Sequence, residues 1–174
     1  MADPFRFEDL IDGLIWHESR NDPSAQSHRG ARGLMQIMPG DAHDLWGQGA
    51  PSVFDLGREM GFDVRRENKS TADRLLHDPE LNRTLGTAYF RDLLRAFGGN
   101  IDNALTAYNA GPVAMQNMLA AGKGIQDFAS EEARNYARKV RQEYMDRAGI
   151  SFPEQIDTRQ LTRPQARPAG LLSM

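Results

Sequence analysis

One glutamate, Glu18, stands at a position where a carboxyl group could do chemistry. It follows Ile11 by seven residues and Leu14 by four, so on a helix it shares their apolar face. A carboxyl group at the end of a core-facing stripe is partly removed from water, which raises its pKa as a general acid requires. Spacing alone leaves two other interpretations open: a solvated glutamate at a fraying helix end, or an ion pair with Arg20 or Arg32.

Polar and apolar groups that could hold a sugar follow this glutamate at the ends of predicted elements. Hydroxyl, amide and aromatic groups in such places suit sugars, whose hydroxyl and N-acetyl groups need hydrogen bonds and whose ring faces are apolar. Gly30 and Gly33 indicate positive φ or a close approach of the backbone. The candidate ligand groups are Ser27, Gln36, Met38, Tyr108 and Asn109.

The elements that must position these residues are predicted to be helices and loops, so the fold class is all-α, with a glycine-containing loop region. Caps, prolines and glycines punctuate the apolar periodicity. The predicted helices run from Asp3-Pro4 to about 17–20, from Asp78-Pro79 to Gly98-Gly99, from Asn100 to Gly111, from Pro112 to Gly122 and from Ser130 to Gly149. Shorter helices are expected near 54–60 and from Pro39 toward Trp46.

The chain length of 174 residues predicts one domain over 1–149. Within it, residues 44–77 form a weakly patterned insert that we expect to shape a rim or to dock a partner. Residues 150–174 are polar and interrupted by prolines, so we predict a Pro/Arg-rich tail or linker outside the core.

Composition excludes several classes of protein. The chain has no cysteine, which excludes a disulfide scaffold and a cysteine-zinc site. Its 21 basic and 24 acidic residues give a formal net charge of −3, which argues against nucleic acid as the main ligand. The sequence contains no apolar stretch of about 18 residues, so it predicts no membrane span. The N-terminus lacks a basic region followed by an apolar one, so we expect no classical signal peptide in this chain.

The four histidines, at 17, 28, 43 and 77, show no metal-ligand spacing, and no glycine-rich phosphate loop follows a strand. We therefore predict neither a metal nor a cofactor.

Three segments resemble, in order, the motifs of the soluble lytic transglycosylase family. They are His-Glu-Ser at 17–19, Gly-Leu-Met-Gln-Ile-Met-Pro at 33–39 and Ala-Tyr-Asn-Ala-Gly at 107–111. A weaker match, Glu-Ala-Arg-Asn-Tyr at 132–136, stands where the family often has Glu-Thr-Arg-x-Tyr. The resemblance spans about residues 7 to 145. Each motif is a weak signal by itself, whereas three in the right order at compatible separations are specific.

The resemblance implies a lysozyme-like α-fold and an enzyme that cleaves the β-1,4 bond between N-acetylmuramic acid and N-acetylglucosamine in peptidoglycan. The product in that family is a 1,6-anhydromuramic end, and no water is consumed. One glutamate makes both proton transfers. The motifs supply no obvious second carboxylate, which an ordinary glycoside hydrolase would need.

Carried over residue by residue, the resemblance assigns Glu18 as the catalytic acid and base. Ser27 corresponds to a serine that orients the N-acetyl group and the glutamate. The remaining positions correspond to cleft residues: Gln36, Met38, Tyr108, Asn109 and Tyr136. Alternatives stay open for several of them, since Met38, Tyr108 and Tyr136 would also suit a core and Gln36 could satisfy loop backbone.

Two other functions remain open at this stage. One is a goose-type muramidase that hydrolyses the same bond with water. The other is a non-enzymatic virion protein that keeps a degenerate lysozyme-like module, against which the intact Glu18 argues.

The expected place of action follows from the substrate. Peptidoglycan lies outside the cytoplasm, and a phage particle could deliver the enzyme without a signal peptide. We therefore predict a virion-associated enzyme that acts in the periplasm on the host wall, with the insert and the tail contacting other virion or tail proteins. The alternative is a bacterial periplasmic enzyme whose signal peptide is absent from this chain.

Overall fold

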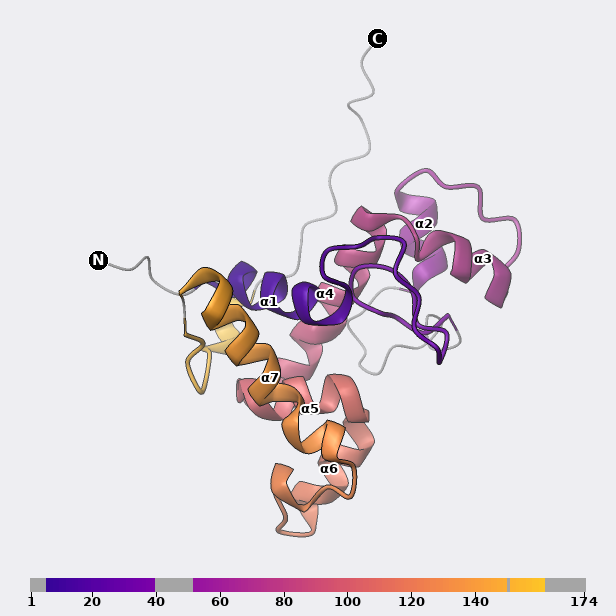
Figure 1. Ribbon diagram of the computed structural model, residues 1–174. Coiled ribbons are helices and arrows are strands. Elements are labelled where there is room, and N and C mark those ends of the chain that lie inside the picture. Colours follow the sequence, from indigo (N-terminus) through magenta and orange to yellow (C-terminus); the bar gives the residue numbers. More distant parts are fainter. Residues whose placement is uncertain (1–5, 40–51, 150, 162–174) are drawn as a thin grey trace.

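The computed structural model describes residues 6–39, 52–149 and 151–161, and these ranges form a mainly helical domain (Figure 1). Within them, β structure is limited to isolated bridges between Gln26 and Arg32, Arg32 and Ile37, and Asn100 and Gln155. The helices are α1 (Phe7–Ser19), α2 (Val53–Glu59), α3 (Lys69–Leu75), α4 (Pro79–Ala96), α5 (Ile101–Ala110), α6 (Pro112–Ala120) and α7 (Glu131–Ala148), with 3₁₀ turns η1 (Ile125–Asp127) and η2 (Thr158–Gln160).

Side-chain caps start the helices where the sequence predicts them. Asp78 accepts a hydrogen bond from the backbone N–H of Leu81 at the start of α4, with Pro79 as the first helical residue. Asn100 caps α5 and Ser130 caps α7 in the same way. The predicted start at Asp3-Pro4 and the helix after Pro39 lie outside the described residues, and α1 begins at Phe7.

The core is centred on helix α5 and its neighbours. Helix α5 packs against α4, α6 and α7, and α1 packs along α7. The apolar stripe of α1 is fully or almost fully buried, and the stripe of α7 buries Tyr136, Val140 and Tyr144. Burial of these faces is the main source of helix stability, because helices of this length are marginal alone.

The segment before α4 belongs to the same core. Val53 and Phe54 of α2 and Leu75 of α3 are completely buried in the cluster that includes α4. Helix α2 matches the predicted helix near 54–60. Helix α3 was not predicted, although Asn68 caps it by accepting from the N–H of Thr71. Residues 44–51 of the expected insert lie outside the described ranges.

The prediction that the chain beyond residue 150 lies outside the core is wrong for residues 151–161. Phe152 and Leu161 are each 5% exposed and belong to the core cluster. Arg141 of α7 donates to the carbonyl oxygens of Phe152 and Pro153 at 2.6 and 2.9 Å. Two apolar anchors and these charge-assisted hydrogen bonds therefore hold a largely polar segment against the helices. Residues 162–174 of the predicted tail lie outside the described residues.

The longest helices of the described part, α4 and α7, are amphipathic rather than uniformly apolar. None of the helices in residues 6–39, 52–149 and 151–161 is long and apolar enough to cross a membrane.

Candidate active site

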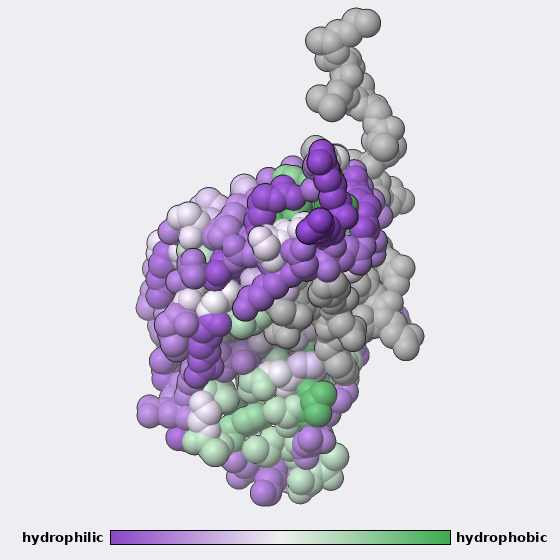
Figure 2. Space-filling model, turned by 90° about the vertical axis from the view of Figure 1, so that its right-hand side faces the viewer, coloured by the Kyte–Doolittle hydropathy of each residue, from purple (hydrophilic) through white to green (hydrophobic). Residues whose placement is uncertain are grey.

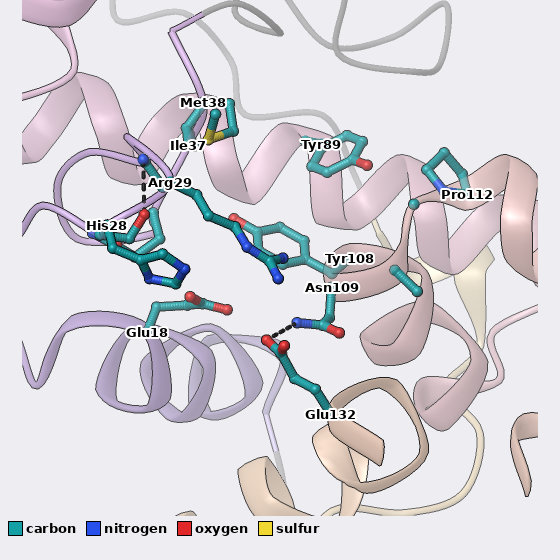
Figure 3. Close-up of a pocket in the computed structure, with 15 residues that line it drawn as sticks. Glu18, His28, Arg29, Ile37, Met38, Tyr89, Tyr108, Asn109, Pro112 and Glu132 are labelled. Carbon is teal, nitrogen blue, oxygen red and sulfur yellow. Dashed lines mark hydrogen bonds between the residues drawn. The ribbon is translucent and has the colours of Figure 1, made fainter. Parts of the chain in front are cut away.

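A cavity of about 540 Å³ brings together six of the seven predicted site residues, all except Tyr136 (Figure 3). One side, which we call the loop wall, is formed by residues 25–38. The other side, the helical wall, consists of the ends of α1 and α5 and the first turns of α6 and α7. Glu18, Ser27, Gln36, Met38, Tyr108 and Asn109 all line the cavity.

Glu18 lies in the last turn of α1, after the buried apolar residues of that helix, and it lines the cavity. The helix ends in Arg20, which has a φ of 56° and donates its backbone N–H to the carbonyl of Trp16. The pKa of the Glu18 carboxyl group is raised to about 7, mainly by burial; the hydrogen bond from Tyr136 acts in the opposite direction, and the charge of Glu132 contributes to the rise. A carboxyl group with this pKa is partly protonated at neutral pH and can act as a general acid.

Tyr136 lies behind Glu18 rather than in the cavity wall. Its hydroxyl group donates to Oε1 of Glu18, and its side chain is buried on the core-facing stripe of α7. The edge of the His17 ring meets the Tyr136 ring, with their centroids 4.9 Å apart. Tyr136 is thus both a core residue and a hydrogen-bond donor to the acid, which combines the two interpretations that the sequence left open.

An ion-pair cluster holds the end of α1 against α7. Glu143 of α7 faces Nδ1 of His17 at 3.2 Å and forms an ion pair with Arg20. The hydrogen bond from Arg20, followed by the smaller influence of His17, lowers the pKa of Glu143. The neighbours of Glu18 in sequence are therefore fixed to the same helix that carries Tyr136. Arg20 and Arg32, the alternative ion-pair partners of Glu18, pair instead with Glu143 and Asp73.

A buried amide attaches the loop wall to the helices. Asn82 of α4 is completely buried and accepts from the N–H of Met35 at 2.8 Å. Its Nδ2 donates to the carbonyl oxygens of Arg32 and Leu76 at 2.9 and 2.8 Å. Gly33 has a φ of 73°, and a Cβ there would lie 2.3 Å from the carbonyl oxygen of Leu76. Only glycine therefore fits where the loop passes Asn82.

Ser27 and Gln36 use their side chains within the loop wall. The Ser27 hydroxyl oxygen accepts from the N–H of Ala31 at 3.0 Å, which closes the turn at the tip. Gln36 has a φ of 48°, and its Nε2 donates to the carbonyl oxygens of Ala25 and Gly33 at 3.2 and 2.9 Å. The interpretation of Gln36 as a partner of loop backbone holds, and its side chain nevertheless lines the cavity.

Tyr108 and Asn109 come from the last turn of α5. The Tyr108 hydroxyl group donates to the carbonyl oxygen of Met35 at 2.7 Å, so it links the helical wall to the loop wall. Burial, together with the nearby charge of Glu18, raises the pKa of Tyr108 well above its ordinary value. Asn109 donates through Nδ2 to Glu132 at 3.1 Å, as Figure 3 shows.

Among the cavity residues that the sequence did not single out as ligands are His28, Arg29, Tyr89 and Glu132. Glu132 is the most consequential, because the sequence motifs had shown no obvious second carboxylate. Glu132 precedes Tyr136 by four residues on α7, so the two side chains lie on the same face of that helix. Because Tyr136 contacts Glu18, this spacing is the sequence signal that could have placed Glu132 near Glu18.

Apolar surface borders the cavity at the start of α6. Pro112 lines the cavity, and the next residue, Val113, is 56% exposed. Figure 2 shows an apolar area over the lower part of the molecule, where α6 lies in Figure 1. Apolar groups beside hydrogen-bonding groups suit the two kinds of surface that a sugar presents.

Across the described ranges, no three His, Cys, Asp or Glu side chains converge as metal ligands would.

Known proteins that are similar to this chain include enzymes of one family. The family model of the transglycosylase SLT domain matches residues 7–130. The soluble lytic murein transglycosylase of Escherichia coli K12 is 33% identical over 131 residues, covering 71% of this chain and 18% of that protein. The peptidoglycan transglycosylase gp16 of Escherichia phage T7 is 31% identical over 152 residues, covering 86% of this chain and 10% of that protein. The chain thus spans less than a fifth of the length of these relatives.

Solved structures show the same fold. The 70 kDa soluble lytic transglycosylase of Escherichia coli has a TM-score of 0.60 and 25% sequence identity, over 87% of this chain and 24% of that chain. An inactive mutant of the lytic transglycosylase Slt of Pseudomonas aeruginosa has a TM-score of 0.56 and 24% identity, over 85% of this chain and 23% of that chain. The predicted all-α, lysozyme-like fold is confirmed.

Proposed function

Since this chain belongs to the transglycosylase SLT domain family, we propose that it is a peptidoglycan lytic transglycosylase. The bond broken is the β-1,4 bond between N-acetylmuramic acid and N-acetylglucosamine. The observation that carries the proposal is the position of Glu18 in a cavity of glycan-binding character, with a pKa raised to about 7.

One carboxyl group suffices for the proposed reaction. Protonated Glu18 gives its proton to the glycosidic oxygen as the bond to the muramic acid breaks. The resulting carboxylate then takes the proton of the hydroxyl group on carbon 6 of the same sugar, whose oxygen bonds to carbon 1. The products are a free N-acetylglucosamine end and a 1,6-anhydromuramic end. Glu18 regains its proton, and no water is consumed.

The other cavity residues have proposed roles in holding the sugars. Ser27, Gln36, Met38 and Asn109 line the walls and provide hydroxyl, amide and thioether groups to the glycan. Tyr108 also lines the cavity, although its hydroxyl group already donates to loop backbone. Tyr136 is a positioning residue, because it reaches the substrate only through Glu18.

Product analysis tests the proposal. Purified peptidoglycan is digested with the wild-type protein and with Glu18→Gln, and the released fragments are measured by mass spectrometry. We expect anhydromuramic ends from the wild-type protein and no fragments from the variant. Failure of the folded wild-type protein to release any fragment would contradict enzymatic activity and favour a structural role.

Glu132 supports one alternative reaction. A second carboxylate in the same cavity is what a muramidase needs to activate water. In that case the fragments would carry reducing ends and each would be one water heavier than the anhydro product. Conversion of Glu132 to Gln would then abolish cleavage as completely as Glu18→Gln.

We further propose that the enzyme acts from a phage particle on the host wall during entry, with other virion or tail proteins as partners. The similarity to peptidoglycan transglycosylase gp16 of phage T7 over 86% of this chain supports this origin. The neighbouring genes test it: virion structural genes on both sides are expected. Neighbours that serve bacterial wall maintenance would instead favour a bacterial enzyme acting in the periplasm.

A further inference from the structure

An arginine at the tip of the loop wall has no role in the reaction described above. Arg29 lines the cavity, and Figure 3 shows its side chain extending from the loop into the cavity toward the side where Tyr108 and Asn109 lie. It is exposed, so substrate in the cavity could reach it.

The backbone beneath Arg29 is well held. The N–H of Gly30 donates to the carbonyl of Ser27 at 2.9 Å, and the N–H of Ser27 donates to the carbonyl of Ala31 at 3.1 Å. The Ser27 side chain closes the same turn through the N–H of Ala31. The start of the Arg29 side chain is therefore fixed at the edge of the cavity, which reduces the entropy lost when a ligand binds.

Arg29 differs from the other arginines near it in the sequence, because those form ion pairs. Arg20 is paired with Glu143, and Arg32 with Asp73. Within residues 6–39, 52–149 and 151–161, no such ion pair engages the Arg29 guanidinium. Glu132, the exposed carboxylate of the same cavity, is hydrogen-bonded to Asn109 instead. A planar, permanently charged group is thus available in the cavity.

A guanidinium that has no ion pair within the described residues matches an anion better than it matches a neutral sugar. Its fork of N–H donors fits the two oxygens of a carboxylate. In peptidoglycan, N-acetylglucosamine carries no carboxylate. N-acetylmuramic acid carries the lactyl group, which ends in a carboxylate on bare strands and in a peptide with its own carboxylates on substituted strands.

We propose that Arg29 is a specificity-determining residue that binds a carboxylate of the muramic acid branch. The inference rests on the proposed function, because it assigns Arg29 to the same glycan. It explains why the loop wall presents a permanent cation to a cavity that also holds two carboxyl groups, those of Glu18 and Glu132. The lactyl group and the peptide stem share the relevant chemistry, and substrates that carry one or the other distinguish them.

Binding measurements test the proposal without turnover. In the Glu18→Gln background, calorimetry gives Kd for three ligands: an N-acetylglucosamine tetramer, a bare strand with free lactyl carboxylates, and a strand with peptide stems. Arg29→Gln should weaken binding of at least one muramic acid strand roughly ten-fold or more, as expected for a charge-assisted pair. Binding of the N-acetylglucosamine tetramer should be unchanged.

The pattern of losses identifies the carboxylate. Loss on the bare strand assigns the lactyl group, and loss on the stem-bearing strand alone assigns the peptide. Arg29→Lys should recover part of the affinity, because it keeps the charge without the fork. Equal losses on all three ligands, or no loss on any, would overturn the proposal.

A matched control removes the same charge elsewhere. Arg66→Gln changes an exposed arginine between α2 and α3, outside the cavity, and should leave all three values of Kd unchanged. An equal effect of Arg66→Gln and Arg29→Gln would show only general attraction to an anionic strand and would overturn the assignment. If the wild-type protein does not cleave peptidoglycan, the proposed function fails and this inference with it. If it cleaves and Arg29→Gln binds normally, the inference alone fails.

Discussion

The two walls of the cavity are built by different physical means. The helical wall places its residues through side-chain packing: Glu18 follows the buried stripe of α1, and Tyr136 belongs to the buried stripe of α7. The loop wall has little regular structure, and hydrogen bonds to its backbone hold it in place. From α4, Asn82 alone makes two such bonds, with the N–H of Met35 and the carbonyl oxygen of Arg32, and a third with the carbonyl oxygen of Leu76 after α3.

The difference separates chemistry from recognition. The helical wall carries Glu18, the proposed acid, whose pKa burial raises, the hydrogen bond from Tyr136 behind it lowers, and the charge of Glu132 raises. The loop wall supplies polar and charged side chains that face the cavity from an irregular backbone, among them Arg29. Changes in the helical wall should therefore alter the rate and its pH dependence, and changes in the loop wall should alter stability and ligand binding.

The largest expected effect is a loss of cleavage rate when a residue of the helical wall is changed. Glu18→Gln keeps the shape of the side chain but can neither give nor regain a proton. The rate of peptidoglycan cleavage should fall by about 10²–10⁴-fold or more. Turbidity of a peptidoglycan suspension measures the rate, and circular dichroism shows that the fold is retained.

Glu80→Gln is the matched control, because Glu80 is exposed at the start of α4, outside the cavity. It should cleave at the wild-type rate. Near-normal cleavage by folded Glu18→Gln would show that the catalytic assignment is wrong.

The helical wall was largely predictable from sequence and the loop wall was not. Asp78, Asn100 and Ser130 mark helix starts through hydrogen bonds to residues three positions later, so local sequence carries the signal. Asn82 lies 47 residues from Met35, and nothing local in either segment shows that they meet. The motif resemblance predicted Ser27, Gln36 and Met38 as cleft residues, and all three line the cavity. The hydrogen bonds that hold their loop against the helices depend on the tertiary structure and could not be predicted from it.

Composition gave a wrong prediction for residues 151–161, because a few residues decide how this segment packs. Residues 151–161 are mostly polar, yet Phe152 and Leu161 are buried. The ring of Phe152 stacks on Tyr144 with centroids 5.0 Å apart. A Cβ on Gly13 would lie 2.7 Å from the Phe152 ring, so a gap on α1 receives it. Two anchors in eleven residues are too few for an average over the segment to reveal.

The second largest effect should come from the loop wall. Asn82→Ala leaves the N–H of Met35 and two carbonyl oxygens without their partner in a buried place. Each unsatisfied buried group costs about 1–3 kcal/mol, so the free energy of unfolding should fall by roughly 3 kcal/mol or more. Urea unfolding measures it.

Asn117→Ala makes the same change at an exposed position of α6, and should stay within about 0.5 kcal/mol of wild type. A comparable, small loss for both variants would contradict the role of Asn82 as the attachment of the loop wall.

Glu18 should also make stability depend on pH, with a sign set by its raised pKa. Below about pH 4.5 the group is protonated in both the folded and the unfolded state. Between about 4.5 and about 7 only the unfolded state loses this proton, so the folded state loses stability as the pH rises. At about 1.4 kcal/mol per pKa unit, the loss is at most on the order of 3 kcal/mol above pH 7.

Urea unfolding of wild type and Glu18→Gln from pH 4 to 8 measures this contribution as the difference between the two curves. Glu143→Gln provides a comparison of opposite sign, since the hydrogen bond from Arg20 lowers the pKa of Glu143. The stability that Glu143 contributes is present above its unfolded pKa and is lost as the pH falls. Parallel curves for wild type and Glu18→Gln would mean that the pKa of Glu18 is ordinary.

The smallest effect concerns the hydrogen bond that Tyr136 donates to Glu18 from behind the helical wall. Tyr136→Phe removes the hydroxyl group that donates to Glu18 and lowers its pKa, while the ring stays in the core. The pKa of Glu18 should rise, and the fall of kcat/KM on the alkaline side should move to higher pH, by up to about one unit for a hydrogen bond to a charged group. Tyr144→Phe is the control on the same helix, because its hydroxyl group donates to Asp9 at 3.3 Å and not to Glu18. The pH profile of Tyr144→Phe should match that of wild type. A shift of the Tyr136→Phe profile to lower pH would show that another group controls the alkaline side, and that packing rather than this hydrogen bond is the contribution of Tyr136.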